Sequence, residues 1–342
     1  MIRSTQFFAA LLVASLVAAW LEWTAEESVD LDGKVVVLEG KPEAITAVRW
    51  VGEDTETTVT RRSDSNGEFF WVDYTRWTEK TLPAARSASD TGEAPEPEVE
   101  RIAKPSVFKS AQRSESLMES FSPLAAKRSL VVDDAEKLIK LGLASPSSRI
   151  EIDRGGTTET LDIGSEAYGT RDYYARHART GRIYLLERDL VQPLKYARTR
   201  LPDRTLHSFD RAEIVTADLS AADQKSTWKH HDADDKMKAY WTPVDSPDDE
   251  AEQANTWLDK FLGLKGTKYA DPSDPPSDLS VRFVLTLSGE TKSETVEVLQ
   301  VGDDGDWYAR SGHTRGLLKL VRSGASELAD GVQPLLSSSA AQ

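Results

Sequence analysis

The chain of 342 residues contains no cysteine. This absence excludes disulfide bonds, thiolate zinc sites, iron–sulfur clusters, cysteine nucleophiles and an acylated lipoprotein cysteine. Positive charge is also scarce, because 42 Lys and Arg stand against 57 Asp and Glu and give a net charge of −15. Binding to phosphate groups needs clustered Lys and Arg, so this balance argues against a nucleic acid partner.

The common catalytic motifs are missing as well. The sequence has no Gly-x-Ser-x-Gly elbow, no phosphate-binding loop and no Gly-x-Gly-x-x-Gly after a predicted strand. His177, His207 and His313 stand isolated in the sequence, and we expect them to be exposed. We therefore predict a protein that is not an enzyme, with no catalytic residues, no cofactor and no bound metal.

Two acidic motifs resemble metal sites. The sequence HHDADD at residues 230–235 combines imidazole and carboxylate groups, which suit zinc or manganese. Adjacent histidines on a strand point to opposite faces, however, so this stretch is better interpreted as a solvated hairpin turn. The sequence GDDGD at residues 302–306 lacks the alternating carboxylates and the closing Glu of a calcium loop, and it also predicts a turn.

Two short motifs occur twice, in the same order. The sequence DYYAR at residues 172–176 recurs as DWYAR at 306–310, and VQPL at 191–194 recurs at 332–335. On a strand, the Asp, the second aromatic residue and the Arg of the first motif would share one face. We interpret this as packing within a repeat rather than as a shared ligand surface, and we predict a tandem duplication.

Hydrophobic periodicity and turn residues predict the same order of elements in each unit. Predicted strands cover residues 44–51, 57–61, 69–74, 149–153, 158–163, 173–176 and 182–186 in the first unit, and 213–219, 225–230, 239–241, 281–287, 294–301, 307–310 and 317–321 in the second. Predicted helices cover residues 107–127, 135–141, 188–197, 248–263 and 325–336. The predicted class is α+β, with two tandem repeats that each place helices on one face of an antiparallel sheet.

The predicted domain limits follow from this pattern. The first α+β repeat covers residues 42–205 and includes a flexible insertion at 83–105, which is rich in Pro, Ala, Ser and Glu. The second repeat covers residues 206–336, and residues 337–342 form a tail.

Residues 1–24 contain an export signal. Residues 5–21 are uncharged, and as a helix they would span roughly 26 Å, the low end of a bilayer crossing. Arg3 precedes them and acidic residues follow, which predicts a single-pass inner-membrane protein with a cytoplasmic N-terminus and a periplasmic body. Trp20 and Trp23 favour a retained signal anchor, while VAA at 17–19 leaves a cleaved signal peptide as the alternative.

Three stretches resemble one bacterial family. They are PEAITAV at 42–48, LGLASP at 141–146, and YAR at 174–176 followed by RIYLL at 182–186 and LPDR at 201–204. Over residues 42–336 the chain resembles the domain of unknown function 4340 family. This resemblance implies a membrane-anchored, exported repeat protein, associated with ABC-type transport components and gliding-motility auxiliary proteins. It brings no catalytic residues to carry over.

These observations predict a non-enzymatic, membrane-anchored periplasmic accessory or interaction subunit of an ABC-type transport or gliding-motility complex. Its partners would be integral membrane or periplasmic proteins, such as an ABC-type permease or a motility component. One alternative is an envelope module that binds a glycan or another small ligand through exposed aromatic residues, since the chain has nine Trp. A further alternative is a metal-dependent hydrolase that uses His230 and His231.

Overall fold

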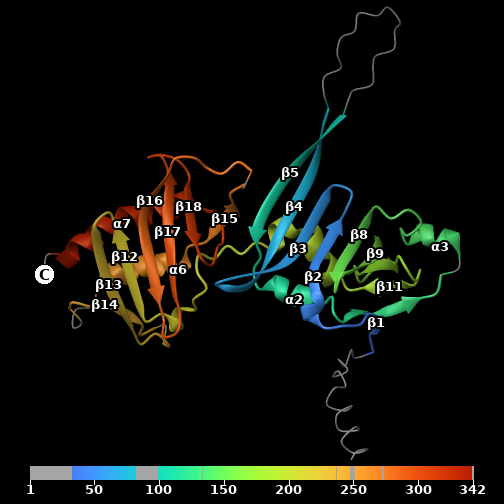
Figure 1. Ribbon diagram of the computed structural model, residues 1–342, viewed down its shortest axis with the longest axis horizontal. Helices are drawn as coiled ribbons and strands as arrows, with labels where there is room; N and C mark the ends of the chain where they lie inside the picture. The colour runs from blue at the N-terminus through green and yellow to red at the C-terminus, as the bar shows by residue number, and fades with distance from the viewer. Residues whose placement is uncertain are drawn as a thin grey trace, which may run out of the picture.

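Two large antiparallel sheets form the body of the protein. The computed structural model describes residues 33–81, 99–132, 134–235, 237–246, 251–271 and 273–340. Figure 1 shows the two sheets side by side along the long axis, joined by a single connector. A third, two-stranded sheet pairs β1 (Val35–Leu38) with β6 (Leu124–Ala126) beneath the first large sheet.

The first large sheet has nine strands in the order β5-β4-β3-β2-β8-β9-β10-β11-β7. Its strands are β2 (Ile45–Val51), β3 (Thr55–Asp64), β4 (Gly67–Thr81), β5 (Val99–Lys109), β7 (Arg128–Leu130), β8 (Ser148–Arg154), β9 (Thr157–Glu166), β10 (Tyr173–His177) and β11 (Ile183–Leu186). The second has eight strands in the order β14-β13-β12-β16-β17-β18-β19-β15. Its strands are β12 (Thr216–Ala221), β13 (Gln224–His231), β14 (Tyr240–Pro243), β15 (Gly266–Tyr269), β16 (Leu279–Ser288), β17 (Ser293–Val301), β18 (Trp307–Ser311) and β19 (Leu318–Leu320).

The two sheets follow the same path except at one edge. When β2 is matched to β12 and β8 to β16, every strand of the second sheet has a counterpart in the same position of the first. Only β5 has no counterpart. The repeated motifs occupy equivalent places in the two sheets. DYYAR and DWYAR fall on β10 and β18, and the two VQPL motifs fall in the helices that follow, α4 and α7.

Alternating apolar residues place each core on one face of its sheet. Along β2, Ile45, Val48 and Trp50 are buried, and Ile150 and Ile152 of the neighbouring β8 lie on the same face. Helix α4 (Arg188–Lys195) contacts β2 and β3, while α6 (Glu252–Gly263) and α7 (Arg322–Ala340) pack against each other and against the second sheet. The remaining helices are short: α2 (Arg113–Glu119), α3 (Ala135–Lys140), α5 (Ala197–Arg200) and the 3-10 turns η1 (Pro42–Ala44) and η2 (Arg211–Glu213).

The predicted α+β class is wrong. The described residues are mostly β, with 47% in strands and 21% in helices, and their strands form three antiparallel sheets. The largest local error is the helix predicted over residues 107–127, which contains instead the end of β5, the short α2 and β6. Apolar spacing favoured a helix there, but the backbone of β5 pairs with β4 along all eleven of its residues, and tertiary pairing overrides local propensity.

The predicted terminal and inserted segments lie partly beyond the described residues. The segment at 1–24 lies outside them, and none of the helices within the described ranges is long and apolar enough to cross a membrane. Of the insertion predicted at 83–105, residues 83–98 are not described and residues 99–105 belong to β5. Of the tail predicted at 337–342, residues 337–340 belong to α7 and residues 341–342 are not described.

Candidate functional site

The connector that joins the two sheets, residues 201–204, lies between an edge of the first sheet and an edge of the second. Ala111 N–H donates to Leu201 O at 2.9 Å, and Asp203 N–H donates to Lys109 O at 3.0 Å, so the connector pairs with the end of β5. On its other side, Gly266 N–H of β15 donates to Arg204 O at 2.8 Å. Residues 201–204 therefore bridge the outer strands of both sheets, which fixes the position of one edge beside the other.

A buried polar cluster fastens this junction. Lys109 Nζ of β5 lies 2.7 Å from Asp203 Oδ2 of the connector, and His313 Nε2 from the turn after β18 lies 2.8 Å from the same oxygen. Thr205 Oγ1 lies 2.6 Å from Asp203 Oδ1 and 2.9 Å from His313 Nε2. The side chains of Lys109 and Asp203 are only 9% and 10% exposed. Both sheets and the connector thus share one set of hydrogen bonds.

Burial and charge act against each other in this cluster. Burial lowers the pKa of Lys109, and the hydrogen bond to Asp203 offsets only part of that effect. Burial alone would raise the pKa of Asp203, but hydrogen bonds from His313 and Lys109 outweigh it and hold that pKa well below its ordinary value. Asp203 is consequently ionised at neutral pH, with both of its oxygens occupied. The cluster thus joins the two sheets through buried hydrogen bonds.

A second contact joins the β3–β4 hairpin to the turn between β18 and β19. Arg315 binds Asp64 through two hydrogen bonds of 2.6 and 2.9 Å, and its guanidinium carbon lies 4.1 Å from the centre of the Phe69 ring. A Cβ atom on Gly312 would lie 2.9 Å from Asn66 Nδ2, at the far end of that side chain, so the two turns lie close together. These residues belong to opposite sheets, and their contact holds the junction on a second side.

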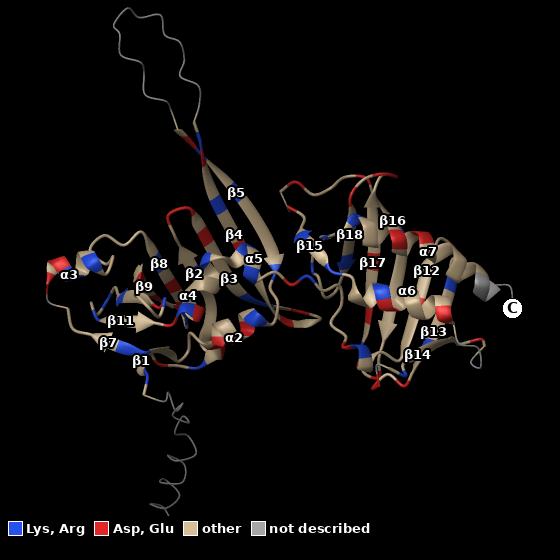
Figure 2. Cartoon of the chain, turned by 180° about the vertical axis from the view of Figure 1, so that it is seen from behind, with Lys and Arg blue, Asp and Glu red and all other residues tan. Residues whose placement is uncertain are grey.

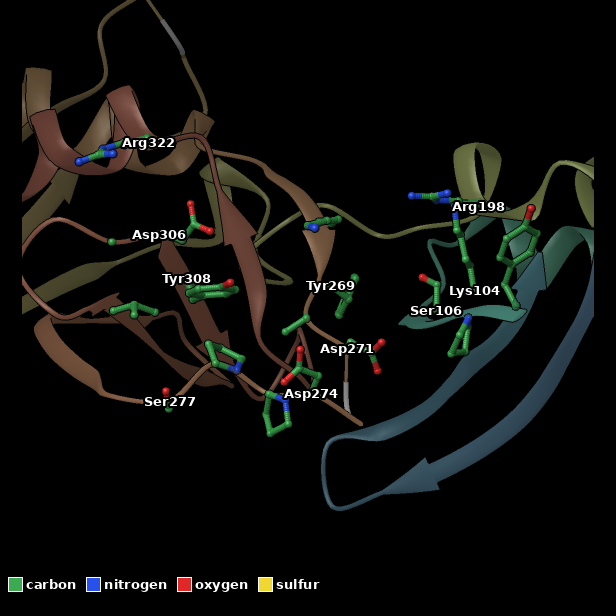
Figure 3. Close-up of a pocket in the computed structure, with 18 of the residues that line it drawn as sticks. Lys104, Ser106, Arg198, Tyr269, Asp271, Asp274, Ser277, Asp306, Tyr308 and Arg322 are labelled. Atoms are coloured by element: carbon green, nitrogen blue, oxygen red, sulfur yellow. The ribbon is translucent and has the colours of Figure 1, made fainter. Parts of the chain in front are cut away.

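An open cleft of about 770 Å³ lies at the junction, between β5 and β15. Figure 3 shows Lys104, Ser106 and Arg198 on the wall formed by the first sheet and α5. Tyr308, Asp306, Asp271 and Asp274 lie on the facing side, which belongs to the second sheet and its loops. The first wall carries cations alone, whereas the facing wall carries four Asp together with Lys268 and Arg322.

The cations and the acids of the cleft also differ in how they are partnered. Within the described ranges, Lys104, Arg198 and Lys268 make no ion pair. Two of the acids are occupied: Asp306 pairs with Lys319, and Asp271 accepts hydrogen bonds from the main chain and side chain of Ser273. Arg322 also lines the cleft and makes no ion pair within the described ranges, although it donates to the main-chain oxygen of Asp304 at 2.8 Å. A protein of net charge −15 thus carries four cations without an ion pair around one cleft.

His230 and His231, the candidate metal ligands of the sequence, pack against aromatic rings. The His230 ring stacks on Trp241 with the ring centres 4.1 Å apart, and the His231 ring stacks on Tyr240 at 4.9 Å. His230 Nδ1 lies 3.0 Å from Ile214 O, and His231 Nε2 lies 2.9 Å from Thr242 Oγ1. No group of three or more His, Cys, Asp or Glu able to hold a metal occurs among the described residues.

The repeated DYYAR and DWYAR motifs form cross-strand ion pairs. Arg176 of β10 lies 2.8 Å from Asp162 of β9, and Arg310 of β18 binds Glu297 of β17 in the equivalent place. Asp172, at the start of the first motif, binds Lys127 at 3.0 Å and not the Arg of its own motif. Each motif thus joins neighbouring strands of its own sheet, as expected for packing within a repeat.

The expectation that the isolated histidines are exposed is wrong. His177 is buried and lies 3.3 Å from Glu159, while His207 and His313 are partly buried. His313, Asp203 and Lys109 were missed as a site because His313 lies 110 residues beyond Asp203 and 204 beyond Lys109. No local pattern marks residues that meet only after both sheets have formed.

A comparison with known families identifies the chain. A family model described as "Domain of unknown function (DUF4340)" matches residues 101–282, which is more than half of the 342 residues. The chain belongs to this family. No curated protein and no solved structure matches it. The DUF4340 match runs from β5 into β16, so it contains the connector, Lys109, Asp203 and the two sheet edges that border the cleft.

Proposed function

We propose that this DUF4340 protein is a non-enzymatic interaction subunit of an envelope complex of the ABC-type transport or gliding-motility kind. The family membership and the resemblance described above support this class of complex. The uncharged residues 5–21, with Arg3 before them and acidic residues after them, support delivery to the periplasmic side of the inner membrane, whether that segment is retained or cleaved.

One structural observation carries the proposal: an arm made from β4 and β5 extends past the rest of the first sheet (Figure 1). β3 reaches only to the pair between Thr55 and Arg76, and Trp77 N–H still donates to Asp54 O at 2.9 Å, so residues 78–81 of β4 pair with β5 alone. Val99 at the start of β5 is 52% exposed, and the Arg101 guanidinium carbon lies 4.8 Å from the centre of the Trp77 ring. We define residues 77–81 and 99–103 as the arm.

The arm adds little to the stability of the body. Two hydrogen bonds join its base to the turn between β2 and β3, from Trp77 N–H to Asp54 O and from Arg101 to Glu53 O. Beyond them the arm is a two-stranded ribbon, which is marginal in water because it buries too little apolar surface to offset the ordering of its backbone. Structure that extends away from a core without strengthening it is suited to reaching another molecule. The polar clusters of the junction, by contrast, hold elements of the chain together, which favours an interaction role over a reaction.

The proposal is tested by recovery of partners from native membranes. The tagged full chain would be crosslinked in cells, extracted in mild detergent and purified, and the recovered proteins would be quantified by mass spectrometry. We expect a permease or motility component in near-stoichiometric amount. Recovery of the chain alone would overturn the proposal.

A variant without the arm serves as the matched comparison. Thr78 and Ile102 face each other in β4 and β5, and main-chain alternation makes them a hydrogen-bonded pair. Replacing residues 79–101 by Asn-Gly would therefore close the hairpin with a two-residue turn. We expect this variant to keep the melting temperature of the parent and to lose most of the partner. Unchanged recovery would show that the arm does not carry the interaction.

A further inference from the structure

We propose that the cleft between β5 and β15 receives an extended, acidic segment of the partner protein, which lies between the two sheets as an added strand. This inference rests on the proposed function, because it adds to the arm a second contact with the same partner and names the chemistry that the partner presents there. Two features support it: two open strand edges border the cleft, and the cations around it lack ionic partners.

The outer edge of β5 is available over the length of the cleft. Ser110 N–H donates to Phe70 O of β4 at 2.9 Å, whereas Lys109 O and Ala111 N–H bond to the connector on the other side. Main-chain groups alternate along a strand, so those of the odd-numbered residues of β5 point away from β4. Pro105 falls in this outward set, and proline is tolerated at an edge because its missing N–H removes no bond to β4.

The facing edge is open in the same way. Ala270 N–H donates to Leu317 O at 2.8 Å, so Ala270 turns its N–H toward β19. The alternation then turns the main chain of the preceding residue, Tyr269, toward the cleft, where it has no hydrogen-bond partner among the described residues. Ala103, Val107 and Tyr269 are thus main-chain positions that an inserted strand would bind.

The connector provides an internal precedent for such a strand. At the closed end of the junction, residues 201–204 lie between the same two edges and bond to β5 on one side and to β15 on the other. Its Pro202 makes an antiparallel bridge with Ser110. A partner segment in the cleft would continue this arrangement along β5 from Val107 toward Ala103. At about 3.3 Å per residue, four to six residues of the partner would fill that stretch.

Charge indicates that the inserted segment is acidic. Lys104 and Arg198 stand on the wall formed by β5 and α5, and Lys268 stands on β15. Figure 2 shows Lys and Arg positions on β5, α5 and β15 beside the junction. Carboxylates on the partner would form charge-assisted bonds with these cations, and the carboxylates of Asp274 and Asp304 on the opposite wall would repel an acidic segment that entered in the wrong orientation.

Site-specific crosslinking in the full chain tests the position. A photo-crosslinking residue would replace Ser106, which lines the cleft, and a control would replace Val244, which is 49% exposed after β14 on the far edge of the second sheet. We expect a covalent adduct with the partner at position 106 and none at 244. Mass spectrometry of the adduct should place the linked residue in an acidic segment.

Two substitutions test the chemistry. Lys104→Glu reverses one cation, with Lys229→Glu on the exposed side of β13 as its control. Ala103→Pro removes one outward N–H without touching the ladder to β4, with Ala103→Val as its control. We expect Lys104→Glu and Ala103→Pro each to lower partner recovery about tenfold at an unchanged melting temperature, the loss of one good polar interaction, and the controls to retain it.

The outcomes separate this inference from the proposed function. If the parent chain recovers a partner but position 106 gives no adduct and Lys104→Glu binds normally, the cleft is not the docking site and the interaction role stands. An adduct with a lipid, a glycan or a basic segment overturns the proposed occupant. If the parent chain recovers no partner, the proposed function fails, and the cleft proposal fails with it.

Discussion

The buried pair of Lys109 and Asp203 gives the sharpest quantitative prediction. The two charged atoms lie 2.7 Å apart and both side chains are about nine-tenths buried. Removing one partner of such a pair leaves a buried charge without compensation, which costs about 3–5 kcal/mol. We expect Asp203→Asn and Lys109→Met each to lower the free energy of unfolding by about 3 kcal/mol, out of the 5–15 kcal/mol typical of a domain.

The double variant, Asp203→Asn with Lys109→Met, shows whether the loss of stability comes from the interaction between the two charges. Once both charges are gone, neither is left buried alone, so the double variant should lose about 1–3 kcal/mol less than the sum of the two single losses. Urea unfolding followed by tryptophan fluorescence at neutral pH measures all four members of the cycle. The exposed pair of Lys260 and Glu327, with side chains 49% and 61% exposed, is the control, and Lys260→Met should change stability little.

The pH dependence has a definite sign. The folded-state pKa of Asp203 is lowered, so its contribution is complete above the unfolded pKa near 3.9 and is lost as the pH falls toward the lower folded value. The gap in stability between the parent and Asp203→Asn should therefore narrow below about pH 4. The folded-state pKa of Lys109 is also lowered, so burying its charge destabilises the folded protein at neutral pH. This cost becomes smaller as the pH rises toward 10.5, the ordinary pKa of Lys.

Two results would refute this account of the junction. Single losses below about 1 kcal/mol would mean that the cluster is hydrated well enough to behave like a surface pair. Strictly additive losses would mean that Asp203 stabilises the connector through Thr205 and the backbone rather than through the charge of Lys109.

Three further predictions concern packing, the second junction contact and metals. Gly266→Ala should lower the free energy of unfolding by about 1–3 kcal/mol in urea, because its Cβ would lie 2.2 Å from Leu318 Cγ. Gly263→Ala is the control and should leave stability nearly unchanged, because nothing lies within 4 Å of its Cβ. Equal losses in the two variants would contradict this packing argument. Arg315→Met should speed amide hydrogen exchange at the tip of the β3–β4 hairpin, because its ion pair with Asp64 is lost, while strands far from the junction keep their rates. Dialysis against a chelator should leave the melting temperature unchanged, since the adjacent histidines of β13 are used in ring stacking; a drop that zinc or manganese reverses would restore the metal interpretation.

Sequence by itself determined the repeated order of strands. Alternating apolar residues and turn residues act between near neighbours, so the strands around Ile45, Ile150 and Leu161 could be located without the fold. The echoes DYYAR and DWYAR fell on equivalent strands because the same local pattern places the same side chains toward the core. The stretches that resemble DUF4340 could likewise be recognised in the sequence, and the family match agrees with them.

Local pattern failed where long-range pairing decides the structure. Residues 107–109 have apolar spacing that also suits a helix, and only the presence of β4 beside them makes them a strand. The predicted fold class was wrong for the same reason, since extended pairing between distant segments outweighed short helical patterns.

The junction was beyond the reach of the sequence altogether. Lys109, Asp203 and His313 form one cluster from three distant parts of the chain, and Arg315 meets Asp64 across 251 residues. Nothing near any of these residues marks its partner, because a buried charge becomes favourable only when folding brings the opposite charge beside it. The tertiary structure alone therefore decided where the two sheets meet, which edges stay open, and which cations are left facing the cleft.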